Sequence, residues 1–284
     1  MLRENREDGV ESGFWEARDD LAGREEDRVI DSHVHLDADQ YPDPSRPIKR
    51  ALDAGITGIV VPGTGGASNR RVLELAHQFP RVVFAACGYH PERLELTDAD
   101  LEDALATIRA ERDSLCAVGE VGMPWYGDRA REPAVVARAR QILTRMARAA
   151  VDADLAVIVH APHDSAREAL EVLKGAEVRR AVFHWHKSDD ATTRAILDAG
   201  YFISLTPEVA YRDRDQRLAK VVPLDRMLLE TDGPWPYAGP FKGRATEPAM
   251  IVETADAIAL LLNVSRELVA SATTTNARML FRLP

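Results

Sequence analysis

The sequence predicts an α/β fold, a single-domain (β/α)8 TIM barrel preceded by a short charged N-terminal extension. From residue 29 onward, short runs rich in Val and Ile alternate with longer amphipathic stretches, which is the pattern of repeated strand-helix units. Eight such runs fit into roughly 250 residues, the usual length of this barrel. An open doubly wound sheet would need a glycine-rich phosphate loop after its first strand, and the sequence has none.

The apolar runs place the eight strands, and the stretches between them place the helices. The expected strands are residues 29–36, 58–62, 82–88, 116–121, 156–160, 181–184, 201–205 and 227–230. The expected helices are residues 68–78, 99–109, 133–150, 165–173, 189–198, 248–262 and 265–280, the last with Ser265 as its N-cap.

Composition narrows the class of protein. The chain has 284 residues, 45% of them hydrophobic, so it can bury a large core. No apolar run approaches the roughly 18 residues that span a bilayer, and residues 1–28 are charged where a signal peptide is apolar. We therefore expect a soluble cytoplasmic protein without a membrane partner. Cys87 and Cys116 lack a metal-binding spacing and are expected in the core.

Negative charge is concentrated at the N-terminus. The chain has 36 Lys and Arg against 46 Asp and Glu, which gives a net charge of −10. Residues 1–28 hold ten acids and five Arg, so half of that charge belongs to an extension that precedes the barrel domain of residues 29–284. The acidic balance argues against a basic surface that grips extended duplex DNA.

Side chains that can bind metals end several of the predicted strands. The C-terminal ends of barrel strands meet at one mouth, so residues far apart in sequence gather there. His33 and His35 are two residues apart and therefore point to the same side of a strand. A buried Glu or Asp is costly unless it is paired or coordinated, which favours a metal site over chance. The six candidate ligands are His33, His35, Glu120, His160, His184 and Asp232.

This set of donors predicts hydrolysis. Imidazole and carboxylate groups bind Zn, Mn, Fe, Co or Ni, and Mg is a further candidate. The types of donor alone do not determine which of these metals is bound. Six ligands allow two divalent ions, with Glu120 as a bridge. Such ions would activate a metal-bound water for attack on the scissile bond. Asp232 could then act as the general base.

The motifs of the chain resemble those of the TatD family of metal-dependent hydrolases, within the amidohydrolase-like barrels. The resemblance runs from about residue 29 to residue 281. It rests on DSHVHLD at 31–37, CGYHP at 87–91, AVGEVG at 117–122, VH at 159–160, His184, LLETDGP at 228–234, EP at 247–248 and NARMLF at 276–281.

The resemblance implies a two-metal site and a deoxyribonuclease activity that several members have. In that site His33, His35 and Asp232 serve one ion, His160 and His184 serve the other, and Glu120 bridges them. The chain departs from the family in the loops that face the substrate. Met123 and Pro124 stand where Leu-Asp is common, and residues 184–188 read HWHKS where many members read HCFSG.

Four further residues are candidates for substrate binding: His90, His186, Lys187 and Arg244. His90 ends the third run and could donate to a phosphate or carbonyl oxygen, with a structural role as the alternative. His186 faces the same side as His184 if the strand continues, and a loop position is equally compatible with the sequence. Lys187 and Arg244 could offset substrate charge.

These residues predict a two-metal hydrolase, with a TatD-like phosphodiesterase or deoxyribonuclease as the first hypothesis. The substrate would be a small molecule or a single-stranded nucleic acid, and the protein a monomer or a small homo-oligomer. An amide, ester or lactone hydrolase could use the same metal site. A non-catalytic metal-binding scaffold is the third hypothesis.

Overall fold

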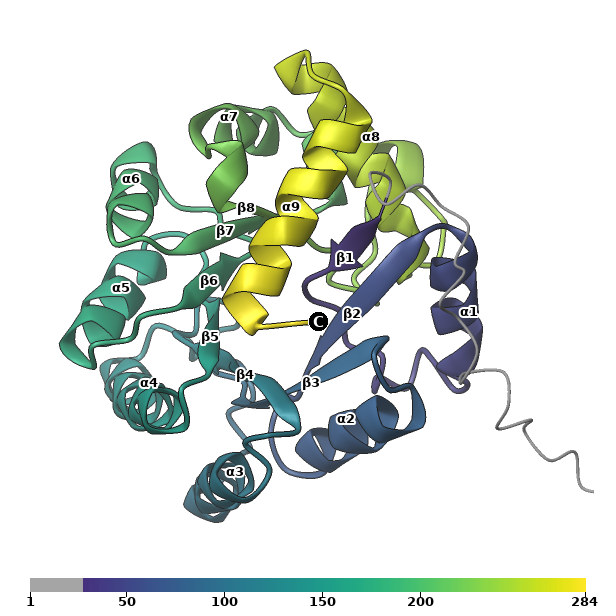
Figure 1. The fold of residues 1–284 in the computed structure, drawn as a ribbon. Coiled ribbons are helices and arrows are strands. Elements are labelled where there is room, and N and C mark those ends of the chain that lie inside the picture. The colour runs from purple at the N-terminus through teal and green to yellow at the C-terminus, as the bar shows by residue number, and fades with distance from the viewer. Residues whose placement is uncertain (1–27) are drawn as a thin grey trace, which may run out of the picture.

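The computed structural model describes residues 28–284, in which eight parallel strands form a ring surrounded by helices (Figure 1). Each strand pairs with the next one along the chain, in the order β1 to β8. Residues 1–27, which make up nearly all of the expected extension, lie outside the described part. The strands are β1 Val29–Asp31, β2 Ile56–Pro62, β3 Val83–Tyr89, β4 Leu115–Gly122, β5 Ala156–His160, β6 Ala181–His184, β7 Phe202–Leu205 and β8 Met227–Leu229.

Backbone hydrogen bonds between the last and first strands complete the ring. The Ser32 N–H donates to the Leu229 carbonyl at 2.9 Å, and the Asp232 N–H donates to the His33 carbonyl at 2.9 Å. Together with the parallel pairing of the other strands, these bonds confirm the predicted (β/α)8 barrel.

Helices follow the strands and cover the outside of the ring (Figure 1). The α-helices are α1 Ser45–Asp53, α2 Ala67–Gln78, α3 Asp98–Ala110, α4 Pro133–Ala153, α5 Ser165–Gly175, α6 Asp190–Asp198, α7 Asp213–Val221, α8 Ile251–Leu262 and α9 Arg266–Phe281. Short 3-10 helices are η3 Pro207–Ala210, η4 Leu224–Arg226, η5 Gly239–Phe241 and η6 Pro248–Met250.

Two helices, α1 and α7, lie outside the helical ranges given above, although Gly55 was expected to end a helix. The α7 segment is highly charged and buries only Asp215 and Ala219, so it lacks the apolar stripe that indicates a helix. The α1 segment is only nine residues long, and its buried side chains are Pro47, Ile48, Ala51 and Leu52. The expected N-cap of α9 is confirmed, because the Ser265 hydroxyl accepts from the Leu268 N–H at 3.2 Å.

The interior of the barrel is closed at the N-terminal end of its strands by α9, which crosses the ring in Figure 1. Leu280 and Phe281 of α9 pack against inward-facing residues of the strands, among them Ile30, Ile158 and Leu228. A second cluster of apolar residues fills the layer between the strands and the outer helices. This arrangement leaves the C-terminal end of the strands available for function.

No single helix within residues 28–284 is long and apolar enough to cross a membrane. The segments 248–262 and α9 reach that length and hydropathy only when they are taken together, and they are bent by 116° relative to each other. Cys87 and Cys116 are both buried and free, as expected for core residues.

Candidate metal centre

The six predicted ligands meet at the C-terminal end of the strands. β1 ends at Asp31, earlier than expected, so His33 and His35 lie just beyond it. The chain nevertheless stays attached to the sheet, because the Val34 N–H donates to the Val60 carbonyl at 3.1 Å. The Nε2 atoms of His33 and His35 lie 3.2 Å apart, so the two rings converge on one point.

Glu120 occupies the middle of the cluster and is only 1% exposed. Its Oε1 lies 2.7 Å from His160 Nδ1 and 2.6 Å from His184 Nε2. Its Oε2 lies 3.4 Å from His33 Nε2 and 3.3 Å from His35 Nε2. One carboxylate therefore separates two pairs of imidazoles, which is the arrangement that a bridging ligand requires.

A bulge in β4 aims Glu120 inward. The pairing register shifts between Cys87 and Tyr89 on β3, and between Val118 and Val121 on β4, so the ladder is interrupted around Glu120. Gly88 permits this approach, because a Cβ at that position would lie 2.3 Å from the Glu120 backbone nitrogen.

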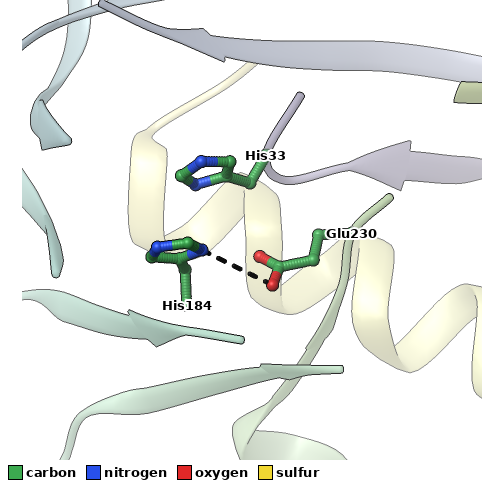
Figure 2. Close-up of side chains that lie close together, drawn as sticks. All are labelled: His33, His184 and Glu230. Carbon is green, nitrogen blue, oxygen red and sulfur yellow. Dashed lines mark ion pairs between the residues drawn. The ribbon is translucent and has the colours of Figure 1, made fainter. Parts of the chain in front are cut away.

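His184 is fixed on two sides. Its ring stacks on that of His33, with centroids 4.0 Å apart and planes 11° apart (Figure 2). Its Nδ1 lies 3.7 Å from Oε1 of Glu230, a fully buried residue that also accepts from the Trp185 N–H and the Ser204 hydroxyl, both at 2.6 Å. Glu230 was not among the predicted site residues, although its position at the end of the predicted strand 227–230, two residues before Asp232, was a signal that could have identified it.

Asp232 lies beside the first pair of histidines. Its Oδ1 is 3.6 Å from both His33 Nε2 and His35 Nε2. Its backbone has a φ of 45°, in the left-handed region that Asp tolerates better than most residues. Burial raises the pKa of Asp232 to about 7, so this carboxylate can exchange a proton near neutral pH.

The charges of the cluster fit bound cations. Burial lowers the pKa of His33 to about 4, which keeps the ring neutral and able to ligate. Burial would raise the pKa of Glu120, but the surrounding imidazoles hold it well below its usual range. Glu120 Oε2 is buried without a hydrogen-bond donor, although two ring nitrogens face it. A divalent ion would satisfy these converging lone pairs, and the same holds for Oε1 with His160 and His184.

Comparison with known proteins identifies the family to which the chain belongs. The family model described as TatD related DNase matches residues 30–282. The chain belongs to the TatD family. A Mycobacterium tuberculosis protein described as an uncharacterized metal-dependent hydrolase TatD is 34% identical, over 90% of this chain and 98% of its own. The human deoxyribonuclease TATDN3 is 28% identical, over 89% of this chain and 94% of its own.

The fold comparison agrees with the family. The crystal structure of YJJV, a TatD homologue from Escherichia coli, superposes with a TM-score of 0.82 and is 27% identical. The match covers 90% of this chain and 98% of the other. This TatD protein is therefore a metal-dependent hydrolase in a TatD-type barrel, with relatives that are named deoxyribonucleases.

A cavity of about 800 Å³ opens above the His/Glu cluster of this TatD protein. His90 and Lys187, two of the predicted substrate contacts, line it. His90 Nε2 also lies 3.2 Å from Glu120 Oε1, so this ring belongs to the cluster itself. Residues that were not predicted complete the wall, namely Glu92, Tyr126, Glu208, Tyr211, Arg212 and Arg214.

The other two predicted substrate contacts lie elsewhere. His186 is 1% exposed, and its Nε2 lies 2.9 Å from the Thr193 hydroxyl of α6. Arg244 pairs with Glu253 of α8 at 2.6 Å and is not among the residues that line the cavity. The structure therefore brings together His90 and Lys187 with the six predicted ligands, and leaves His186 and Arg244 outside the cavity.

Lys187 contributes positive charge to the cavity wall. Its Nζ lies 3.5 Å from the centre of the Trp185 ring and 3.4 Å from the Tyr126 hydroxyl. Among residues 28–284 no carboxylate forms an ion pair with it. Burial lowers the pKa of Lys187 to about 8, which leaves the amine mostly protonated at pH 7.

Proposed function

We propose that this TatD protein is a two-metal phosphodiesterase that acts on single-stranded DNA or on small nucleotides. The observation that carries the proposal is the position of Glu120 between two pairs of imidazoles, with one carboxylate oxygen directed at each pair. Two ions that share a carboxylate form the usual clamp for phosphoryl displacement.

In this proposal His33, His35 and Asp232 hold one ion, His160 and His184 hold the other, and Glu120 contacts both. When bound, the ions supply a lowered pKa for water and positive charge for the developing oxyanion. His90 lies close enough to Glu120 to contact a substrate oxygen beside the cluster.

Asp232 is proposed as the general base. Its carboxylate lines the cavity and lies 3.6 Å from both His33 Nε2 and His35 Nε2. The backbone N–H of Asp232 donates to the His33 carbonyl at 2.9 Å, which holds the side chain beside the first pair of histidines. The base is therefore fixed where it can take a proton from the attacking water.

The cavity wall supports an anionic substrate that carries a ring. Lys187 supplies a cation that pairs with no carboxylate of residues 28–284, and Trp185, Tyr126 and Trp235 supply aromatic surface. A nucleotide offers both a phosphate for the amine and a base for the rings.

The proposal is tested with metal-reconstituted protein and the matched variants Asp232→Asn and Lys187→Met. We expect cleavage of single-stranded DNA or of a bis-aryl phosphodiester with Mn, Zn, Co or Mg. Asp232→Asn should lower kcat by roughly 100-fold or more, the scale of a lost general base. Lys187→Met should mainly raise KM, because its amine is proposed to bind rather than to react.

A panel of amides and lactones decides between bond types. Hydrolysis of a lactone or amide in the absence of phosphodiester cleavage would contradict the proposed substrate. Full metal loading without turnover on either panel would favour the scaffold hypothesis.

A further inference from the structure

Glu92 lies behind one of the two histidines that are proposed to hold the second ion. It belongs to the loop that follows β3, and it lines the cavity. Its Oε1 lies 3.3 Å from His160 Nε2. The other nitrogen of that ring, Nδ1, lies 2.7 Å from Glu120 Oε1 and 3.2 Å from His184 Nε2. His160 therefore presents Nδ1 to the metal centre and Nε2 to Glu92.

The same carboxylate oxygen holds a second segment of the cavity wall. The backbone N–H groups of Trp125 and Tyr126 donate to Glu92 Oε1 at 2.6 Å and 3.1 Å. These residues belong to the loop that follows β4, and the Tyr126 hydroxyl accepts from Lys187 Nζ at 3.4 Å. Glu92 Oε1 therefore contacts both the His160 ring and the backbone of the Trp125–Tyr126 loop.

His184 has a comparable arrangement on its far side. Glu230 Oε1 lies 3.7 Å from His184 Nδ1 and accepts from the Trp185 N–H at 2.6 Å. Each of the two histidines therefore has a carboxylate near the nitrogen that faces away from Glu120, and each carboxylate also binds backbone of a cavity loop. A carboxylate in this position fixes the tautomer and orientation of the ring and strengthens it as a ligand.

We infer that Glu92 is a positioning residue for the second ion, which keeps His160 Nδ1 directed at the metal centre while anchoring the Trp125–Tyr126 segment. The inference rests on the proposed function, because it requires an ion on His160 and His184.

The variant Glu92→Gln separates the two parts of this role. The amide retains an oxygen for the N–H groups of Trp125 and Tyr126 but lacks the charge that holds the His160 ring. We expect binding of the second ion to weaken by 10- to 100-fold, as measured by Co(II) titration against a chelator. The visible absorption of that Co(II) ion should change, and binding of the first ion should not.

Glu95→Gln is the matched control, because Glu95 lies on the same loop, is 67% exposed and pairs with Arg93 at 2.8 Å. Its Co(II) affinities and spectrum should equal those of the wild type. Glu92→Asp, which keeps the charge with a shorter reach, should weaken the second ion as well and replaces the Gln variant if circular dichroism shows that the latter is unfolded.

Wild-type Co(II) affinity and spectrum in folded Glu92→Gln would overturn the inference, even if Glu92→Ala were impaired, since the residue would then serve only as a loop anchor. Complete loss of the second ion at saturating Co(II) would also overturn it, because Glu92 would then be a ligand. Failure of the proposed function is seen separately, as a single ion in the wild-type titration or as no cleavage of phosphodiesters.

Discussion

Asp31 is a buried carboxyl group that supports the ligands without belonging to them. It is 0% exposed and accepts from the backbone N–H groups of His33 and Thr231, at 3.2 Å and 3.1 Å, and from the Thr231 hydroxyl at 2.5 Å. Burial raises the pKa of Asp31 to about 8, so at pH 7 the group is mostly neutral. It joins the ends of β1 and β8 without placing another negative charge beside the ligands.

The raised pKa of Asp31 predicts a pH-dependent stability of the metal-free protein. The folded protein keeps a proton up to about pH 8 that the unfolded chain, with a pKa of 3.8, has already released. The free energy of unfolding should therefore fall by up to about 1.4 kcal/mol per pH unit as pH rises from about 4 to 8, and then level off. Asp31→Asn should remove this contribution, as measured by urea unfolding at pH 5 to 8. A variant with the full wild-type slope would show that Asp31 is ionised in the fold.

The bulge of β4 shows how a strand is bent to deliver one side chain. The side chain of Asn69 supplies hydrogen bonds to the β3 backbone beside the bulge. Its amide nitrogen donates to the Gly88 carbonyl at 3.0 Å, and its amide oxygen accepts from the Gly88 N–H at 2.9 Å. Gly88 leaves no room for a side chain between β3 and the Glu120 backbone. The position of Glu120 therefore depends on a glycine in the neighbouring strand.

Substitution of that glycine should disturb the site through the backbone. In Gly88→Ala the new Cβ would lie 2.3 Å from both the Glu120 nitrogen and the Gly63 oxygen. We expect a loss of about 1–3 kcal/mol in the free energy of unfolding, the usual cost of overpacking, together with weaker binding of both ions. Gly175→Ala, at the end of α5 with no atom within 4 Å of its Cβ, is the control and should be neutral or slightly stabilising. Equal metal affinity in the two variants would argue against this role of the bulge.

Much of the barrel, and the proximity of the six candidate ligands, could be predicted at the level of elements. β5 and β6 begin and end where expected, because continuous apolar runs mark strands that are buried on both faces. The ligands were identifiable because strand ends converge whatever the loops do. Glu92 and Arg214 could not be found in this way. Their contacts depend on loop conformations, or on which groups face each other across the ring, and periodicity carries no information on either.

Metal binding should stabilise the whole molecule. The cluster places Glu120 and several imidazoles together, and ions bound only by the folded state add RT ln(1 + [M]/Kd) to its stability. At a metal concentration of 100 Kd this amounts to about 2.7 kcal/mol per ion, so removal of the metals with a chelator should lower Tm by several degrees. Differential scanning calorimetry with and without chelator measures this shift. The Tm of Glu120→Gln should fall less when the chelator is added. A wild-type Tm that does not change with the chelator would contradict the ligand assignment.

The overall charge is compatible with an anionic substrate at this site. Residues 29–284 carry only half of the net charge of −10. Two divalent ions would make the mouth of the barrel locally positive, so attraction of a phosphate depends on the ions and Lys187 rather than on the surface as a whole.

The helix α9 closes the end of the barrel opposite the cavity, so no substrate or product can pass through the ring. Because Leu280 and Phe281 fill the far end of the ring, a substrate that reaches the metal centre must enter and leave by the same opening. A polymer cannot be drawn through the barrel. Both products of a hydrolysis at this site would have to leave through the same opening. A product that remains in the cavity should therefore act as a competitive inhibitor.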